Sequence, residues 1–246
     1  MPMSPTVSVV IPAKNEERYL PLVLEGLKRQ THQPIQVILA DAHSTDKTRD
    51  LALAGGCLVV EGGMPGPGRN AGAKHATGDV ILFLDSDVKI DDPKFIENAL
   101  AEMQAKHLAV ATTYIELLNG SWADKLGHRI YNRYVRLWGA VRPHAPGFCI
   151  FIQRQLFEAV GGFDPSVLLG EDHELAGRAS KLGKFGFLNT VSIGVTDRRF
   201  RRDGSLNVGI KYALAELHML FLGPIRHDLF HYDFGYDDVH NEKEFR

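Results

Sequence analysis

The sequence lacks three features that would each point to a particular class of protein. Its 28 lysines and arginines are balanced by 30 aspartates and glutamates, so no positive excess suggests a nucleic-acid partner. No apolar run reaches the roughly 18 residues that a membrane-spanning helix needs. The first six residues carry no charged and apolar leader. These absences favour a globular protein of the cytoplasm.

Cysteine is also scarce. The chain has two cysteines, Cys57 and Cys149, and each lies inside an apolar run. No cluster of cysteines and histidines has the spacing of a zinc site. We therefore expect two buried free thiols, as in a protein of a reducing compartment.

The 246 residues form either one large domain or one domain with an extension. In the first part of the chain, apolar runs typical of buried strands alternate with helical periodicity, which predicts parallel βαβ units. The expected strands there are 7–11, 36–40, 57–60 and 80–84. The helices between them are 16–29 and one that begins at Ser44, with Ser44 or Thr45 as its N-cap, and a short helix after the Gly/Pro-rich loop 62–68.

The second part is less regular. Strands are expected at 108–115, 148–152 and 191–195, and helices at 121–138, 171–182 and 205–222. The sequence thus predicts an α/β fold, with a mostly parallel sheet flanked by helices. We divide it into a domain at 1–203, with halves at 1–90 and 91–203, and a helical C-terminal extension and tail at 204–246.

The most informative motif follows the apolar run Val80–Leu84, where Asp85 and Asp87 stand one residue apart. Two carboxylates so close together repel each other unless a cation lies between them. Hard oxygen ligands suit Mg²⁺ or Mn²⁺, and such ions usually share their ligand shell with substrate phosphates. Strand ends in an open α/β sheet are also where ligands bind. The alternative is that both aspartates cap the turn before the next helix.

Five other segments stand in a fixed order around this motif. They are IPAKNEE at 11–17, DAHSTDKT at 41–48, GRNAGAKHATGD at 68–79, GEDHEL at 170–175 and DRRF at 197–200. Each segment is weak evidence by itself, but the ordered set resembles the family 2 glycosyltransferases, enzymes of the GT-A fold that use nucleotide sugars. The resemblance covers roughly residues 5–202.

The resemblance implies roles for residues on the donor side. Asp41 is matched to the acidic residue that contacts the base or ribose, although DAHSTD departs from the usual DDGSTD pattern. Asp87 is the expected ligand of Mn²⁺ or Mg²⁺. Asp85 is expected on the ribose or the metal-bound water, and thus shares the metal site. The remaining residues expected at the nucleotide are Pro12, Asn15, Glu16, Arg69 and Asn70.

The acceptor side is implied in the same way. Inverting sugar transfer needs a general base for the acceptor hydroxyl, and the resemblance assigns this role to Asp172, with Glu171 in support. The alternative is that both only favour a helix N-terminus, where acidic residues suit the dipole. In the basic segment that follows the last strand, Arg199 or Arg202 is expected on the diphosphate, while Arg198 and Arg201 are expected in solvent.

Two amphipathic helices complete the picture. Helix 121–138 carries Trp122, Leu126 and Ile130 at helical spacing beside a basic stripe, and helix 205–222 has a similar apolar face. Such helices suit the surface of a membrane. The alternative is that they pack on the core or on a second subunit of a homodimer. Attachment to the inner face of the cell membrane would suit a lipid-linked acceptor.

The sequence therefore predicts an inverting, metal-dependent transferase that moves a sugar from a nucleoside-diphosphate sugar to an acceptor hydroxyl of a lipid-linked or cell-envelope glycan. The expected donor is a UDP-sugar. Two alternatives stay open. A sugar-1-phosphate nucleotidyltransferase shares a similar core, but usually has a glycine-rich loop where this chain has PAKNE. A degenerate sugar-nucleotide-binding protein would keep the fold without turnover.

Overall fold

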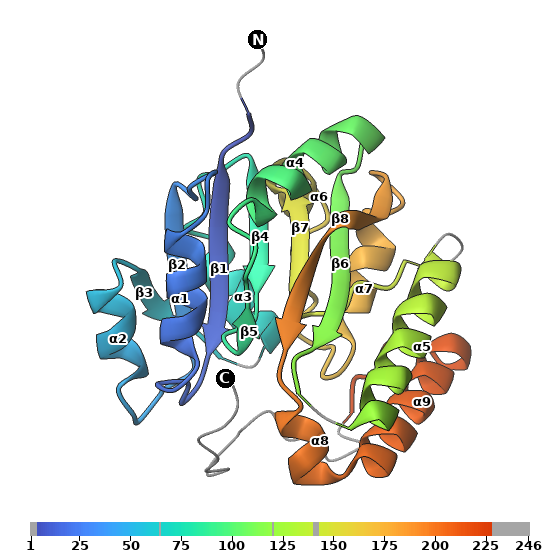
Figure 1. The fold of residues 1–246 in the computed structure, drawn as a ribbon. Coiled ribbons are helices and arrows are strands. Elements are labelled where there is room, and N and C mark those ends of the chain that lie inside the picture. The colour runs from blue at the N-terminus through green and yellow to red at the C-terminus, as the bar shows by residue number, and fades with distance from the viewer. Residues whose placement is uncertain (1–3, 64, 120, 140–142, 228–246) are drawn as a thin grey trace.

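The structure is a computed structural model and describes residues 4–63, 65–119, 121–139 and 143–227 (Figure 1). Within these ranges one mixed sheet of eight strands has the order β3-β2-β1-β4-β7-β6-β8-β5. The strands are β1 (Val7–Ala13), β2 (Gln36–Asp41), β3 (Leu58–Glu61), β4 (Val80–Leu84), β5 (Val88–Lys89), β6 (Val110–Leu117), β7 (Cys149–Gln153) and β8 (Phe185–Val195).

The first four strands form the parallel half that the sequence predicts. β1 pairs in parallel with β2 on one side and β4 on the other, and β2 pairs with β3. Every residue of β4 is buried, as expected for a strand covered on both faces. The helices that connect these strands are α1 (Leu20–Lys28), α2 (Thr48–Ala54) and α3 (Pro65–Ala73).

The second half inserts one strand of opposite direction. β7 lies between β4 and β6 and is antiparallel to both. β6 therefore points the same way as β4, and β8 is parallel to β6. The carboxyl ends of β1, β2, β4, β6 and β8 consequently meet at one edge of the sheet, where ligands of open α/β sheets bind. β5 turns back there and pairs antiparallel with β8.

Helices cover both faces of the sheet (Figure 1). One apolar cluster joins the sheet to α1 and to α4 (Phe95–Lys106), with Leu20 and Phe95 fully buried. A second cluster joins the other face to α6 (Arg154–Ala159) and α7 (Glu171–Ala179), with Phe163 and Leu175 at its centre. Cys57 and Cys149 are both buried free thiols, as predicted.

Several element boundaries differ from the prediction. α2 begins at Thr48 and not at Ser44, because Ser44 and Thr45 are engaged by Asn15: the Asn15 N–H donates to Ser44 Oγ at 2.9 Å, and Thr45 N–H donates to Asn15 Oδ1 at 2.8 Å. α3 already begins within the expected loop, at Pro65. β8 begins at Phe185, six residues before the expected start at Val191.

Three helices follow or flank the sheet at one side of the molecule. They are α5 (Trp122–Gly139), α8 (Arg198–Asp203) and α9 (Ser205–Phe221). Figure 1 shows α5 and α9 next to each other beyond β6. α8 ends the predicted domain, and α9 lies in the predicted extension, whose residues 228–246 are outside the described ranges. Strands of both predicted halves join a single sheet, and the proposed division of the chain stays a prediction.

Candidate active site

Acidic side chains from distant parts of the chain gather at the edge where the parallel strands end. Asp85 and Asp87 follow β4, Glu16 lies after β1, and Glu171 and Asp172 begin α7. Asp85 raises the pKa of Glu16, and Asp87 and Asp172 both raise the pKa of Asp85. The five carboxylates therefore form one electrostatic group. The structure thus brings the expected metal motif and the expected base together.

Arg69 joins the two halves of this group. Its side chain is almost completely buried, with Nη1 2.7 Å from Glu171 Oε1 and Nη2 2.8 Å from Asp85 Oδ1. Nη2 also donates to the carbonyl of Gly147 at 3.2 Å. Burial opposes the charge of Arg69, but the carboxylates Asp85 and Glu171 outweigh it and raise the arginine pKa. Arg69 therefore fixes the expected base helix against the expected metal motif.

Arg198 makes a second bridge and corrects our expectation that it is solvated. It is buried, and its guanidinium binds both oxygens of Glu16, at 2.9 and 3.2 Å. Its Nη2 lies 2.9 Å from Asp87 Oδ2, and its charged group stacks over the ring of Tyr19. Charge alone suggested a solvent-exposed loop, but planar bidentate pairing with carboxylates holds this arginine in the interior.

The two arginines do not neutralise five carboxylates. Burial raises the pKa of Glu16 to about 7 against the opposing effect of Arg198, and burial raises that of Asp85 to about 6 against Arg69. Burial and the neighbouring Asp172 also raise the pKa of Glu171. The site thus holds an excess of negative charge that a bound cation would relieve.

The residues present fit a divalent cation that is held together with a diphosphate. In the described part of the chain no three carboxylate, imidazole or thiol groups are placed to hold a metal ion. Mg²⁺, however, is commonly bound by one or two carboxylates together with substrate phosphates. Asp87 uses Oδ2 on Arg198, and its Oδ1 accepts no hydrogen bond from any described residue. Asp87 Oδ1 can therefore serve as the single protein ligand of such an ion.

The loop after β1 and the loop after β2 interlock beside this group. Asn15 adopts a positive φ of 55° and bonds to the Ser44–Thr45 segment. Asp41, at the end of β2, is completely buried, accepts from the backbone of Ser44 and pairs with Arg49 at 2.9 Å. Pro12 lies in β1, paired with Ala40. The nucleotide-binding roles of Pro12, Asn15 and Asp41 stay predictions.

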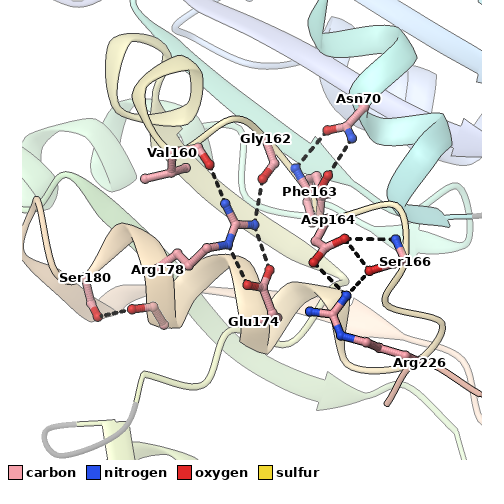
Figure 2. Close-up of polar contacts among 11 residues, drawn as sticks. Asn70, Val160, Gly162, Phe163, Asp164, Ser166, Glu174, Arg178, Ser180 and Arg226 are labelled. Atoms are coloured by element: carbon pink, nitrogen blue, oxygen red, sulfur yellow. Dashed lines mark hydrogen bonds and ion pairs between the residues drawn. The ribbon is translucent and has the colours of Figure 1, made fainter. Parts of the chain in front are cut away.

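Asn70 lies in α3 next to Arg69, but its amide is engaged by the protein itself. Figure 2 shows its side chain bracketing the backbone of Phe163, with Nδ2 2.8 Å from the carbonyl oxygen and Oδ1 2.9 Å from the N–H. From the other side Arg178 of α7 donates to the carbonyls of Val160 and Gly162. The GGFD turn at 161–164 therefore ties α3 to α7. Contact of Asn70 with a nucleotide stays a prediction.

The other arginines of α8 have partners outside the group of five carboxylates. Arg199 donates to the hydroxyl of Tyr212 in α9 at 2.9 Å, and Arg202 pairs with Asp203. Arg201 pairs with Asp197. The expected contact of Arg199 or Arg202 with the diphosphate stays a prediction.

Sequence reasoning missed Gly147. A side chain there would place Cβ 3.0 Å from Asp172 Oδ2 and 3.1 Å from Arg69 Nη2. Glycine therefore leaves the space in front of the expected base open. The segment APGF gave no signal of this, because nothing in the sequence pattern shows which side chains it meets.

Comparison with known proteins places this geometry in a class. The structure of a mannosyltransferase from Pyrobaculum calidifontis in complex with GDP-Man and Mn²⁺ matches 87% of this chain and 65% of that chain, with a TM-score of 0.65 and 19% identity. The structure of Staphylococcus aureus TarS 1–349 in complex with UDP-GlcNAc matches 78% of this chain and 58% of that chain, with a TM-score of 0.62 and 22% identity. The fold is that of the GT-A glycosyltransferases, as predicted.

The family follows from the sequence comparison. Residues 8–161 match the family described as Glycosyl transferase family 2, and the chain belongs to this family. A relative named as an uncharacterized glycosyltransferase, from Rickettsia typhi, is 28% identical over 190 residues, which are 70% of this chain and 58% of the relative. The chain thus spans somewhat more than half the length of this relative.

Proposed function

We propose that this protein transfers a sugar from a nucleoside-diphosphate sugar to an acceptor hydroxyl, with inversion at the anomeric carbon and with Mn²⁺ or Mg²⁺ as cofactor. The observation that carries the proposal is the group of five carboxylates at the sheet edge, which in the described part of the chain is held by two arginines, Arg69 and Arg198. This excess of negative charge at the expected metal motif supports binding of a cation together with a diphosphate.

Each residue then has a defined task. A divalent ion held by Asp87, with Asp85 beside it, would neutralise charge on the departing diphosphate. Asp172 accepts the proton of the acceptor hydroxyl as that oxygen attacks the anomeric carbon. Gly147 keeps the space in front of Asp172 open, and Arg69 holds Glu171 in place behind it. Direct attack in one step, without a covalent intermediate, inverts the configuration.

UDP is the expected nucleotide, and the ligands of related structures support a test that includes GDP. The TarS structure holds UDP-GlcNAc and the Pyrobaculum mannosyltransferase holds GDP-Man with Mn²⁺. In this chain Asp41 is the proposed partner of the base or ribose, because its carboxylate accepts hydrogen bonds from N–H and hydroxyl donors.

The experiment measures nucleoside diphosphate released from UDP-GlcNAc, UDP-glucose and GDP-mannose, with water as the acceptor, in Mn²⁺, in Mg²⁺ and in EDTA. We expect slow release from one donor that depends on the metal. Release of sugar 1-phosphate instead would favour a nucleotidyltransferase. Tight donor binding with no product from any donor would favour a degenerate binding protein.

We further propose that α5 and α9 dock on an anionic membrane surface, which would place the enzyme on the inner face of the cell membrane next to a lipid-linked or envelope-glycan acceptor. Trp122 and Leu206 are each 78% exposed, and several apolar residues along both helices are exposed with them. The polar side of α5, with Lys125, Arg129 and Asn132, lines a hollow against β6 and β8. Packing on the protein core is therefore the weaker alternative.

Basic residues accompany this apolar surface. Arg129, Arg133 and Arg136 are exposed along α5, which suits anionic lipid headgroups. No helix in the described ranges is long and apolar enough to cross a bilayer. The remaining alternative for the same surface is a second copy of the chain in a homodimer.

A further inference from the structure

A second network of titratable side chains lies directly behind Asp172, and no motif drew attention to it. Glu216 of α9 extends toward two histidines, with Oε2 2.8 Å from His144 Nε2 and Oε1 3.7 Å from His173 Nε2. The rings of His144 and His173 lie against each other, with centroids 4.6 Å apart. His144 is buried, and its ring also meets Tyr134 of α5 edge-on.

His173 connects this network to the proposed base. Its backbone N–H donates to Asp172 Oδ1 at 2.8 Å, and its ring Nδ1 lies 3.9 Å from the same oxygen. Nδ1 is buried and has no hydrogen-bond partner among the described residues. A buried polar atom without a partner lowers the stability of the folded state, so its presence requires an explanation.

The chemistry of the His173 ring and the Asp172 carboxylate explains why they form no hydrogen bond with each other. The carboxylate of Glu216 faces Nε2, which favours the tautomer with its hydrogen on Nε2 and a lone pair on Nδ1. An ionised Asp172 has only acceptor oxygens. Nδ1 and Oδ1 are then two acceptors, and they cannot form a hydrogen bond with each other.

This situation changes when Asp172 takes up a proton. The carboxylate becomes a carboxylic acid with one O–H, and a rotation of the carboxyl group directs that O–H toward the Nδ1 lone pair. Hydrogen bonds of catalytic groups are often long before substrate binds and shorten during the reaction. The contact would therefore form only as the acceptor loses its proton, and such contacts lower the barrier rather than strengthen donor binding.

We propose that His173 is a positioning residue for Asp172, held by Glu216 and His144, and that its Nδ1 accepts a hydrogen bond from Asp172 once Asp172 carries the acceptor's proton. The proton moves from the acceptor oxygen to Asp172 as the new glycosidic bond forms and the bond to the diphosphate breaks. Asp172 returns it to water after the product leaves. This inference rests on the proposed function and assigns α9 a part in the chemistry through Glu216.

The test compares variants of the full-length protein in metal-dependent donor hydrolysis. His173→Phe keeps a ring for the stack on His144 but removes both nitrogens. We expect kcat to fall about tenfold or more while KM for the donor stays within about twofold. His173→Asn can present an amide oxygen near the position of Nδ1, and should recover most of the rate. The matched control His173→Gln reaches only the position of Nε2 and should stay slow.

The outcomes separate this inference from the proposed function. If wild type releases no diphosphate from any donor, the proposed function fails. If wild type is active and Asp172→Asn is equally fast, Asp172 is not the base and the role of His173 fails with it. If Asp172→Asn is inactive while His173→Phe keeps its rate, only the role of His173 fails. Should His173→Phe not fold, the two amide variants decide: a faster Asn variant supports Nδ1 as the acting atom, and equal rates or a faster Gln variant refute it.

Discussion

Arg198 and Asp87 lie 111 residues apart in the sequence, yet the arginine Nη2 is 2.9 Å from Asp87 Oδ2. The same guanidinium binds Glu16, so one buried cation joins the loop after β1, the end of β4 and the start of α8. Oδ1 of Asp87 accepts no hydrogen bond from any described residue. Arg198 thus orients the carboxylate whose other oxygen is available to a metal ion.

The first prediction concerns that oxygen. Asp87→Asn keeps the shape of the side chain but replaces one oxygen by an NH₂ group that cannot bind a cation. We expect it to abolish metal-dependent turnover and to weaken nucleotide binding in Mn²⁺ by about tenfold or more, with little change without metal. Calorimetry with UDP or GDP in Mn²⁺ and in EDTA measures this. Equal affinities of variant and wild type in Mn²⁺ would contradict the assignment.

The second prediction concerns the base. Asp172→Asn is nearly isosteric but cannot accept a proton at neutral pH. Turnover should fall on the order of 10²-fold or more while donor affinity changes little. Single-turnover kinetics with saturating donor separate the two effects. A collapse of donor affinity with surviving turnover of bound donor would move Asp172 into the nucleotide site.

The third prediction concerns the buried bridge made by Arg69. Arg69→Met leaves the carboxylates of Asp85 and Glu171 buried without their partner, which typically costs about 3–5 kcal/mol. Urea unfolding at pH 8 should show a loss of this size, and a smaller one at pH 5, where more of these carboxyl groups are protonated. Arg29→Met is the control, because its pairing with Glu25 lies at the surface and should contribute at most about 1 kcal/mol.

The fourth prediction follows from the pKa of Glu16, which burial raises from 4.5 to about 7. Between these values the folded protein holds a proton that the unfolded chain has released, so the stability contributed by this group falls as the pH rises. Glu16→Gln has no proton to lose. In EDTA, its thermal midpoint relative to wild type should therefore increase from pH 5 to pH 8, by roughly a few degrees.

A surface residue supplies the comparison for that experiment. Glu25 lies exposed on α1, and Glu25→Gln should show no such pH-dependent difference from wild type. A Glu16→Gln variant whose difference from wild type is the same at both pH values would show that Glu16 titrates normally in the folded protein.

The parallel half of the fold could be predicted because its apolar runs and helical periodicities are local signals. The antiparallel insertion of β7 could not, because an apolar run such as 149–153 reads the same in either direction. Pairing partners of charged residues were equally hidden. Arg198 was expected in solvent together with Arg201, and its burial depends on Glu16, 182 positions away.

The same limit applies to Glu216. In the sequence it interrupts the apolar face of the helix expected at 205–222, and nothing in the pattern indicates what it contacts. The structure shows that it points toward His144 and His173 while Leu206, Leu214 and Leu217 of the same helix are exposed. Helical periodicity shows which residues share a face, but not what that face meets.

The fifth prediction concerns the exposed apolar surface of α5 and α9. Each lysine or arginine near an anionic membrane contributes on the order of 1 kcal/mol, and salt screens this attraction. The protein should therefore cosediment with anionic vesicles at low salt, less so at high salt, and little with neutral vesicles. A triple variant of α5 should bind vesicles more weakly without a lower thermal midpoint. In this variant glutamine replaces Arg129, Arg133 and Arg136.

A matched control removes the same charge elsewhere, at the exposed lysines Lys28, Lys47 and Lys74. If both triple variants lose vesicle binding equally, the attraction depends on net charge and not on α5. If wild type binds neither kind of vesicle and sedimentation velocity shows a dimer, the surface joins two copies of the chain. A soluble acceptor would then fit the site at Asp172 better than a lipid-linked one, because nothing would hold the site close to a bilayer.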